Sequence, residues 1–510
     1  MDWPPFFVTL SLGMCLVGAG RSSVDMSTCR AESVTYRSPS RSKTASGRLV
    51  QSIPDHFPSM KAHPAPFSKR LWPFIVASLM MFGCSDQMLD GSKSEEPLPS
   101  TKVRNASLFD QAITSPGKKG EQTAITIAIE PTLIVDDHHI MEPYEVVDRY
   151  EVVDRYEVVD RYEVVDRYEV VDRYEVVDRY SFTKTFYGYS LWVSSKHLTE
   201  ILALMEEDPR IAWVEPVFSV RQHPVFEALP GAAESAQWSL PDIGATSSWT
   251  VSGDGTGTVD VEIFIIDSGV SHPDMDVVES HDLAMAGSLS DADGHGTAIA
   301  GIAAAFDDGA GLVGVAPGAR IHSYRVFDAQ GVGDDTYVIA ALEEVLNWRS
   351  AHPDKPAVVN LSLGAAVGRG HTALDDAVQA VIDAGITVVV AAGNHGMDVS
   401  TVTPAHVRDA ITVGAYDQDR RFAPYSNHGP LLDLSAPGTA ILTATPDGNT
   451  AIRSGTSMAA AHVTGAAALH LALHPDASPR EVGKHIRKSA LRSMTHAPPG
   501  TTANTLWVGN

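Results

Sequence analysis

Residues 454–465 have the sequence SGTSMAAAHVTG, which places Ser457 between a turn containing Gly455 and a small, apolar run that favours helix. A serine hydroxyl is a weak nucleophile at neutral pH. It attacks a carbonyl group only with the help of an imidazole base, a carboxylate that orients this base, and donors for the oxyanion that forms. The stretch therefore makes Ser457 a candidate nucleophile if the chain supplies these partners.

The candidate acid and base lie upstream. The apolar run 261–266 predicts a buried strand, and this strand would place Asp267 at its carboxyl end. His295 lies between two glycines, which allow close backbone approach, at the start of the small-residue run 298–303 that predicts helix. We expect Asp267 to orient His295, and His295 to act as the base.

A candidate oxyanion donor follows a second predicted strand. This strand covers 387–392 and ends beside Gly393 and Asn394. The side-chain amide of Asn394 can donate to an oxyanion together with the backbone N–H of Ser457.

The four segments, in the order Asp, His, Asn, Ser, resemble the subtilisin-like serine proteases (peptidase S8). The resemblance covers about 235–475, roughly half of the chain, and includes the further segments 314–319, 358–364 and 434–439. The spacings between the motifs are more similar to the proteinase K branch than to the original subtilisins. One departure is Ala461, which stands where the family usually has proline. Proline early in a helix mainly presets backbone geometry, so this difference concerns helix shape more than chemistry.

The resemblance implies acyl transfer with Ser457 as nucleophile, His295 as base and then acid, and Asp267 holding the tautomer. In subtilisin itself, loss of one oxyanion donor costs about 3 to 4 kcal/mol, or about 10²- to 10³-fold in rate, and Asn394 would be such a donor. An extended substrate would add as a strand beside the segment 362–364. The residues expected to bind it are Ser362, Leu363 and Gly364 along the strand, with Ala391, Ala392 and Gly393 as pocket walls.

Each motif taken alone has an ordinary structural explanation, since a serine after Gly-Thr is often a helix N-cap and a histidine between glycines often lies in a loop. A degenerate protein that keeps the fold and binds peptides without cleaving them is therefore the alternative function. The complete set of four residues favours an active secreted endopeptidase with broad specificity for unfolded proteins. A dedicated processing protease with one substrate stays open, because pocket shape depends on loops.

Composition agrees with an exported α/β enzyme. We predict a protease domain over 224–510, with a mostly parallel sheet flanked by helices on both faces. This region holds about 14 Lys plus Arg against about 32 Asp plus Glu, within a total net charge of −25. Such a surface argues against nucleic-acid binding and keeps the molecule soluble. It is also compatible with a salt-rich habitat, because salt screens self-repulsion. We expect a monomer.

The three cysteines, Cys15, Cys29 and Cys84, all precede the predicted domains, so no disulfide can form inside the protease. The chemistry requires no cofactor. Structural calcium is a possibility that the resemblance suggests, since family members often bind it, although no unmistakable ligand loop is present. The acidic and histidine cluster at 136–139 lacks helical ligand spacing, and no metal site is predicted there.

The first part of the chain has the features of an export signal. Residues 1–59 show no sustained periodicity and predict a spurious or disordered extension, with Met60 as the true start. Residues 60–84 combine a cationic start with an apolar core of about 12 residues, too short to span a bilayer. Gly83-Cys84 resembles a bacterial lipobox, which would make Cys84 a lipid anchor; ordinary cleavage with Cys84 unmodified is the alternative. Both predict an extracytoplasmic, bacterial protein.

An inhibitory segment is expected between the signal and the protease. Residues 85–122 predict a polar linker, and 123–223 show strands at 123–129, 186–193 and 211–216 and a helix at 195–205. This small α+β pattern resembles the I9-like inhibitory propeptide of many subtilisin-like proteases. By that resemblance it would act as an intramolecular inhibitor and be cut off between about 220 and 236. Any lipid anchor would stay with the propeptide, and the mature enzyme would be soluble.

A tandem repeat interrupts this segment. Six identical copies of Tyr-Glu-Val-Val-Asp-Arg run over 144–179. A period of six leaves no constant helical face but matches the strand period of two. In extended form the 36 residues would reach roughly 120 Å, so they cannot form one straight strand in a small domain. We expect a functionally neutral expansion; an adhesive or spacing role is the alternative.

Overall fold

The protein is described from a computed structural model, which defines residues 102–116, 120–130, 134–136, 139–140, 177–209, 211–227, 237–245, 259–285, 287–309 and 311–509. The extension 1–59, the segment 60–84 with Cys84, and most of the repeat lie outside these residues. No helix in the described ranges is long and apolar enough to cross a membrane.

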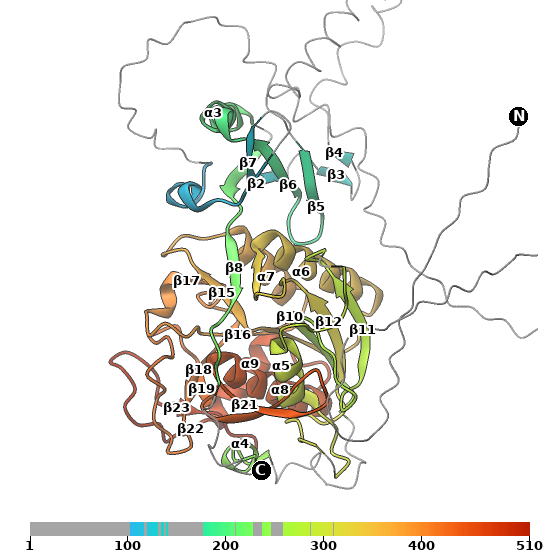
Figure 1. Cartoon of the computed structure of the whole chain (residues 1–510), viewed down its shortest axis with the longest axis vertical. Helices are drawn as coiled ribbons and strands as arrows, with labels where there is room; N and C mark the ends of the chain where they lie inside the picture. The colour runs from blue at the N-terminus through green and yellow to red at the C-terminus, as the bar shows by residue number, and fades with distance from the viewer. Residues whose placement is uncertain are drawn as a thin grey trace, which may run out of the picture. The chain divides into compact units, whose positions relative to one another are not determined.

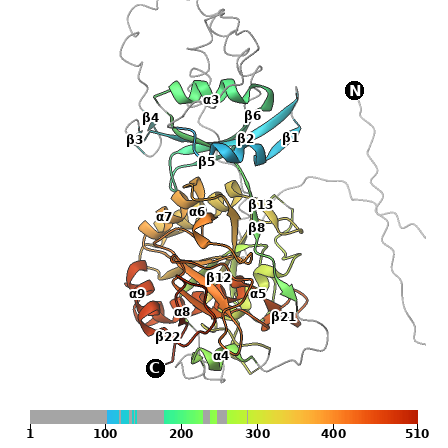
Figure 2. The same cartoon turned by 90° about the vertical axis from the view of Figure 1, so that its left-hand side faces the viewer.

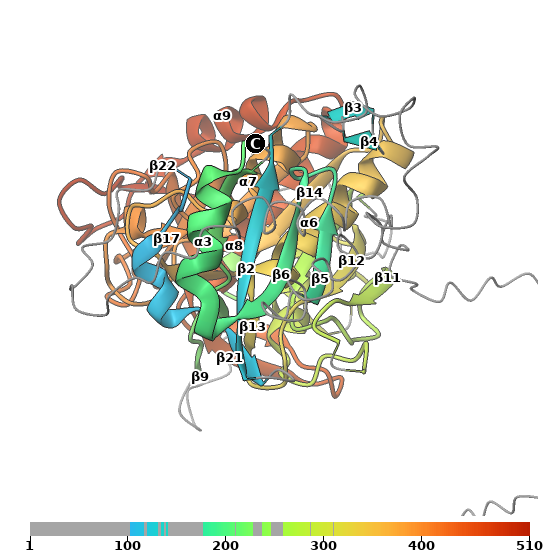
Figure 3. The same cartoon turned by 90° about the horizontal axis from the view of Figure 1, so that it is seen from above.

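The N-terminal part of the described chain is an antiparallel sheet with one covering helix. Its order is β1-β2-β6-β5, and β7 pairs with β2 beside β1, on the edge opposite β6. Figure 3 shows β2, β6 and β5 side by side. The elements confirm the predicted strands and helix to within a few residues. They are β1 (Thr114–Pro116), β2 (Glu121–Ile129), β5 (Val177–Phe182), β6 (Gly188–Ser194), α3 (Leu198–Glu207) and β7 (Ile211–Pro216), with the short hairpin β3 (Ile134–Asp136) and β4 (His139–Ile140) and the 3₁₀ turns at Ala106–Gln111 and Ser195–His197.

Both faces of this sheet are buried. Ile125 and Ile127 of β2 pack with Ile201 of α3 in one cluster. Ala128 and Trp213 belong instead to a cluster that includes residues of the C-terminal domain. Because alternate residues of a strand point to opposite faces, this explains why every residue of β2 after Glu121 is buried.

The C-terminal domain is built on a nine-stranded sheet in the order β11-β12-β10-β14-β16-β18-β19-β23-β22. All neighbours are parallel except β22 and β23, so the mostly parallel α/β fold is confirmed. The strands are β10 (Glu262–Asp267), β11 (Val277–Asp282), β12 (Arg320–Arg325), β14 (Ala357–Leu361), β16 (Thr387–Ala391), β18 (Ile411–Tyr416), β19 (Leu434–Pro437), β22 (Leu491–Arg492) and β23 (Asn504–Thr505).

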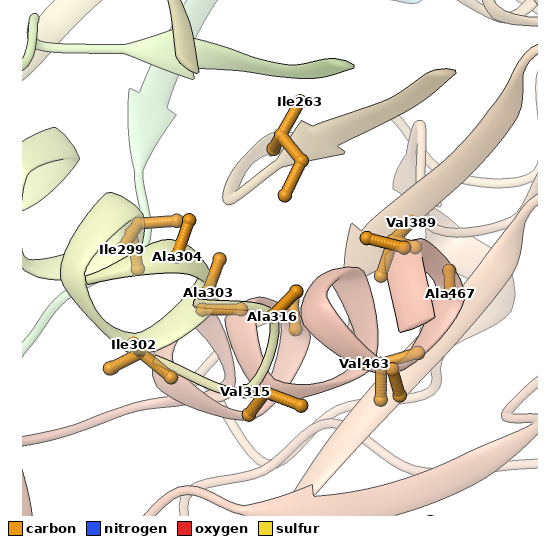
Figure 4. Close-up of a cluster of buried hydrophobic side chains, with 14 of the residues drawn as sticks. Ile263, Ile299, Ile302, Ala303, Ala304, Val315, Ala316, Val389, Val463 and Ala467 are labelled. Atoms are coloured by element: carbon orange, nitrogen blue, oxygen red, sulfur yellow. The ribbon is translucent and has the colours of Figure 1, made fainter. Parts of the chain in front are cut away.

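Helices cover both faces of this sheet, as the sequence predicts. Figures 1 and 2 show α6 and α7 on one side of the strands and α5, α8 and α9 on the other. Ile263 of β10 packs with Ile299 and Val463 in the core of Figure 4, whereas the next residue, Phe264, lies in the opposite core. The helices are α5 (His295–Ala304), α6 (Asp335–Ala351), α7 (Ala373–Asp383), α8 (Thr456–Leu473) and α9 (Pro479–Ser489), with the short α4 at Ser239–Asp242.

Local sequence explains where the outer helices begin. Thr372 and Asp375 form a capping box at the start of α7, and Ser478 and Glu481 form another at the start of α9. Helix α8 differs, because its first fourteen residues are all buried. It contacts α5 and the central strands β14, β16, β18 and β19, which requires small side chains on every face.

The segment that joins the two domains forms two further strands. β8 (Ser219–Gln222) lies between β13 (Val332–Asp334) and β15 (Leu363–Ala366). β15 also pairs with β17 (Val402–Thr403). β9 (Phe226–Glu227) pairs with β21 (Thr450–Ser454), which pairs with β20 (Ile441–Ala444). The chain between the domains is thereby held at both ends of the stretch 219–227.

Candidate active site

Asp267 and His295 are joined directly. Asp267 is the last residue of β10, and His295 is the first residue of α5. His295 Nδ1 lies 2.7 Å from Asp267 Oδ1, and both side chains are almost completely buried. An ionised carboxylate only accepts hydrogen bonds, so Nδ1 carries the shared proton and Nε2 is left as the basic nitrogen.

Opposing effects set the pKa of His295. Burial by itself would lower this pKa, but the charge of Asp267 and its hydrogen bond outweigh burial, and Asp293 adds to them. The pKa is therefore raised above the ordinary value of 6.5. Arg453 acts in the other direction and limits the rise.

Asp291 links the end of β10 to the start of α5, and the sequence analysis did not identify it. Its Oδ1 accepts hydrogen bonds from Ser268 Oγ (2.9 Å) and the Gly294 N–H (2.7 Å). Its Oδ2 accepts one from the Thr297 N–H (2.8 Å). Ser268 Oγ in turn accepts from the Gly296 N–H at 2.9 Å. An aspartate four residues before the candidate base was the only signal in the sequence.

Ser457 lies in the first turn of α8 and is completely buried. Ser457 Oγ and His295 Nε2 are both buried without a hydrogen-bond partner. The structure therefore does not join them by a hydrogen bond, and both atoms keep their bonding capacity for a reacting group. Catalytic hydrogen bonds are often long or misaligned before the reaction starts.

The side-chain amide of Asn394 is fixed by its neighbours. Asn394 Oδ1 accepts hydrogen bonds from the Thr456 N–H (2.9 Å) and Thr456 Oγ1 (2.8 Å). This orients Nδ2 away from Thr456, and Nδ2 donates to the backbone carbonyl of Pro224 at 2.8 Å. Thr456 Oγ1 also accepts from the Gly393 N–H (3.1 Å), so Thr456 is a further positioning residue that motif analysis missed.

The chain's own segment occupies the predicted substrate position. Gly364 pairs with Arg221 and Leu363 with Gln222 in the antiparallel contact of β15 with β8. The next residue, His223, directs its N–H toward the Ser362 carbonyl at 3.5 Å. An extended segment thus lies along 362–364 and leads to the carbonyl bound by Asn394.

His223 fills a recess between two of the predicted pocket residues. A Cβ atom at Gly364 would lie 3.0 Å from His223 Cε1, and one at Gly393 would lie 3.4 Å from it. The ring is buried, and burial together with the charges of His395 and His295 lowers its pKa to about 3. Ala391 and Ala392, the other predicted wall residues, are fully buried.

Two acidic side chains, Glu343 of the C-terminal domain and Glu215 of the N-terminal domain, join the two domains. Both oxygens of Glu343 on α6 accept hydrogen bonds from the loop 183–185, five in all, from three backbone N–H groups and two threonine hydroxyls. Glu215 Oε1 accepts from the Ala373 N–H at the start of α7 (2.7 Å). Burial, with the charges of Asp375 and Asp376, raises the pKa of Glu215 to about 8.

Two predictions from the sequence concern lipid on Cys84 and metal binding. Cys84 lies outside the described residues, as do the side chains of 136–139. Within the described ranges, no group of three or more His, Cys, Asp or Glu side chains could hold a metal ion.

The comparisons with known proteins all point to one family. The model of the subtilase family (peptidase S8) matches residues 259–506. An extracellular serine proteinase of Thermus sp. (strain Rt41A) is 41% identical over 311 residues, which are 59% of this chain and 70% of the relative. Subtilisin E of Bacillus subtilis (strain 168) is 33% identical over 293 residues, 56% of this chain and 72% of that protein.

A solved structure is also similar. It is the crystal structure of a cold adapted subtilisin-like serine proteinase, with 32% sequence identity and a TM-score of 0.47. The match covers 54% of this chain and 98% of that chain.

Proposed function

The chain belongs to the subtilase family and is a subtilisin-like serine endopeptidase, and from this premise we propose that Ser457, His295, Asp267 and Asn394 carry its chemistry. One observation carries the assignment. Asn394 Nδ2 donates to a peptide carbonyl, that of Pro224, in the immediate neighbourhood of Ser457. This is the arrangement that an oxyanion donor requires.

The proposed reaction proceeds by two acyl transfers. Ser457 Oγ forms a bond to the carbonyl carbon while His295 Nε2 takes the hydroxyl proton. The carbonyl oxygen becomes an anion that accepts hydrogen bonds from Asn394 Nδ2 and the Ser457 N–H. Collapse breaks the C–N bond, and His295 returns the proton to the leaving amine. Water then attacks the acyl-serine by the same steps, which releases the acid and restores Ser457.

We propose that the substrate is extended polypeptide of broad sequence. The antiparallel contact of β8 with β15 supports this, because it uses backbone hydrogen bonds that any sequence can supply. The proteinase K branch remains our proposal for the subgroup.

The N-terminal domain, within 123–223, is proposed to be an I9-like inhibitory propeptide of an autoprocessed zymogen. Support comes from its sheet packed on the protease, its loop bound by Glu343, and its last strand lying in the substrate position. The mature protease would then start within 224–510, with any signal at 60–84 and the linker 85–122 removed.

The bond proposed for self-cleavage is Pro224–Val225. The carbonyl of Pro224 lies on Asn394, and Phe226, two residues later, pairs with Ser454 directly before the Gly455 turn. The ring next to Gly364 and Gly393 belongs to His223, however, which is one residue earlier. We expect a new N-terminus at Val225, because the carbonyl of Pro224 is the one that Asn394 binds. An N-terminus at Pro224 would show that the carbonyl of His223 shifts onto Asn394 before cleavage.

We propose a structural calcium site beside Asp274. Asp274 Oδ2 is buried without a hydrogen-bond partner and lies against Gly311. Burial and the charge of Asp308 raise the pKa of Asp274 to about 6, and a cation beside the two carboxylates would lower it. Asp274 and Asp308 would hold the ion together with backbone carbonyls of this loop, and the ion would stabilise the loop without taking part in the chemistry.

We further propose that the protein is a monomer outside the cytoplasm of a bacterium. The relative from Thermus is named extracellular, and the cationic and apolar segment 60–84 supports export. Contact with a membrane would come only from lipid on Cys84. The acidic protease domain supports polypeptides and not nucleic acids as partners.

The catalytic assignment is tested with a fluorophosphonate probe, which reacts with activated serines. The wild-type chain should be labelled at one peptide containing Ser457 and should hydrolyse casein, whereas Ser457→Ala should do neither. Asn394→Ala should keep the label but lose about 10²- to 10³-fold in kcat. Labelling of another serine, or hydrolysis by Ser457→Ala, would contradict the assignment.

A further inference from the structure

The last copy of the hexapeptide repeat takes part in the fold. The sixth copy ends at Arg179, and β5 (Val177–Phe182) begins within it. Within the described ranges, β5 is an edge strand of the N-terminal sheet, since it pairs there with β6 alone.

Arg179 is the extra residue of a β-bulge. Asp178 pairs with Leu191, and Tyr180 pairs with Ser190, so two steps along β5 correspond to one step along β6. A bulge leaves the extra residue unpaired in the ladder and re-aims its side chain. This is how an edge strand can direct one arginine out of the pattern of its sheet.

The side chain of Arg179 reaches the start of α6 in the protease domain. Its Nη2 lies 2.6 Å from Asp334 Oδ2, and both side chains are only 6% exposed. Its Nη1 donates to Thr336 Oγ1 at 3.2 Å, and its guanidinium lies over the ring of Trp192 at 4.7 Å. Asp334 is also the N-cap of α6, where it accepts a hydrogen bond from the Tyr337 N–H. The ion pair is thus desolvated and joined to the helix cap.

Tyr180, which follows the sixth copy and continues its pattern, adds a second contact. Its hydroxyl donates to the Leu283 carbonyl at 3.0 Å. Its ring meets that of Tyr337 edge to face, with centroids 6.1 Å apart. Arg179 and Tyr180 therefore bind two separate parts of the protease domain.

We propose that the end of the sixth repeat copy, with the tyrosine that follows it, is the docking element that holds the inhibitory domain on the protease, through Arg179 and Tyr180, and that the five preceding copies add only length. The proposal rests on the function proposed above for the N-terminal domain. It replaces the interpretation of the whole repeat as neutral with a split between one bound copy and five passive ones.

The residues after the repeat select the sixth copy. Every copy is followed by tyrosine, so each one offers the same Val-Val-Asp-Arg-Tyr sequence. A slip by six residues also keeps every side chain on the same face, since six is a multiple of two. Only the sixth copy is continued by Phe182, which is buried, and by the loop 183–185 that Glu343 binds. An earlier copy in this place would lose these contacts.

The repeat itself supplies a matched control. Arg173 closes the fifth copy and has the same neighbours in sequence as Arg179. We would prepare Arg179→Ala and Arg173→Ala in the full chain carrying Ser457→Ala, which cannot process itself, and measure amide hydrogen exchange of α6. Removing one partner of a buried ion pair is strongly destabilising, so Arg179→Ala should speed exchange in the first turns of α6 at least tenfold, whereas Arg173→Ala should leave it unchanged. Equal exchange in the two variants would overturn the proposal.

Two more variants complete the test. Asp334→Asn removes the partner without altering the N-terminal domain, and it should also speed exchange in the loop 183–185, which a fault confined to α6 would leave unchanged. Deletion of 144–173 leaves one copy and should not change exchange; faster exchange would show that earlier copies contribute.

In the chain with active Ser457, Arg179→Ala should shorten the lag before casein hydrolysis. If no chain hydrolyses casein but the exchange pattern is as expected, the docking proposal stands and the catalytic proposal fails.

Discussion

The proton affinity of His295 decides the pH at which the proposed base is neutral and active. Asp267 and Asp293 raise the pKa of His295, whereas Arg453 lowers it. Arg453 is nine-tenths buried, and its Nη1 donates to the carbonyl of Gly294, the N-cap of α5, at 2.7 Å. Arg453 thus places a positive charge beside His295, which must be deprotonated before it can act as the base.

Arg453→Gln should move the acid limb of kcat/KM to higher pH. Without the nearby cation the imidazolium form of His295 is more stable, so a higher pH is needed to make the base neutral. Arg453→Lys retains the charge and should leave the limb close to that of the wild type. The measurement is kcat/KM for a peptide substrate across pH 5–9, and a limb that stays in place or moves to lower pH in Arg453→Gln would count against this account.

A second residue, Glu215, should make docking of the N-terminal domain depend on pH. Its pKa rises from the ordinary 4.5 to about 8 in the docked form. Below pH 4.5 the group is protonated whether or not the domains are docked. Between these values only the docked form holds the proton, so docking weakens as pH rises through this window and the loss is complete above about 8.

Glu215→Gln should remove that part of the pH dependence. The test is the midpoint of thermal unfolding of the Ser457→Ala chain between pH 5 and 9, with Glu121→Gln, an exposed acid in β2, as control. The midpoint should fall with pH less steeply in Glu215→Gln than in the parent. Identical slopes in these two chains would show that Glu215 does not control docking.

Motifs identified the residues proposed for catalysis, but they did not identify the residues that position them. Asp267, His295, Asn394 and Ser457 follow predicted strands or precede predicted helices, and local sequence marks such positions. Asp291, Thr456 and Arg453 act through side-chain hydrogen bonds between segments far apart in the chain. No periodicity or spacing encodes these contacts, so they required the folded structure.

At the scale of elements, the junction of β10 with α5 depends on Asp291. The carboxylate satisfies two N–H groups at the start of α5 and the hydroxyl of Ser268 at the end of β10. Hydrogen bonds to a buried charge contribute about 1.5 to 3 kcal/mol each. The distance between Asp267 and His295 should therefore be sensitive to this one side chain.

Asp291→Ala should reduce the free energy of unfolding by about 3 kcal/mol, because two N–H groups lose their acceptor inside the protein. It should also lower kcat more than it raises KM, because it displaces His295 and leaves β15 in place. Asp354→Ala, at an exposed loop position, should change stability by no more than about 0.5 kcal/mol. Urea unfolding and steady-state kinetics check both; a drop in stability with unchanged kcat would make Asp291 structural only.

The sequence predicted elements with strong periodicity and missed those made by pairing. The strand at 261–266, the helix at 298–303 and the strand at 387–392 all have counterparts within one to three residues. β8 and β9 were expected only as a cleavage region between 220 and 236. Both are short, and they become strands because β15 and β21 offer free edges far away in the sequence. Such pairing is a property of the assembled fold.

At the scale of the whole molecule, stability should depend on calcium. The described protease region has no disulfide to support it, since all three cysteines lie before residue 85. A chelator should lower the unfolding midpoint of the wild type, and calcium at about 100 times its Kd should add about 2.7 kcal/mol, or roughly 5 to 10 °C. Asp274→Asn should abolish this response, and Asp383→Asn, an exposed change on α7, should preserve it. A response that survives in Asp274→Asn would place the ion elsewhere.

We propose a serine endopeptidase held closed by its own N-terminal domain and opened by its own active site. The most direct measurement is intact mass with N-terminal sequencing of the full chain beside its Ser457→Ala variant, followed over time after folding. We expect that only the chain with Ser457 is cut, that the new N-terminus is Val225, and that casein hydrolysis appears after the cut. Cleavage of Ser457→Ala at the same bond, or a wild-type chain that folds and is neither cut nor active, would contradict it.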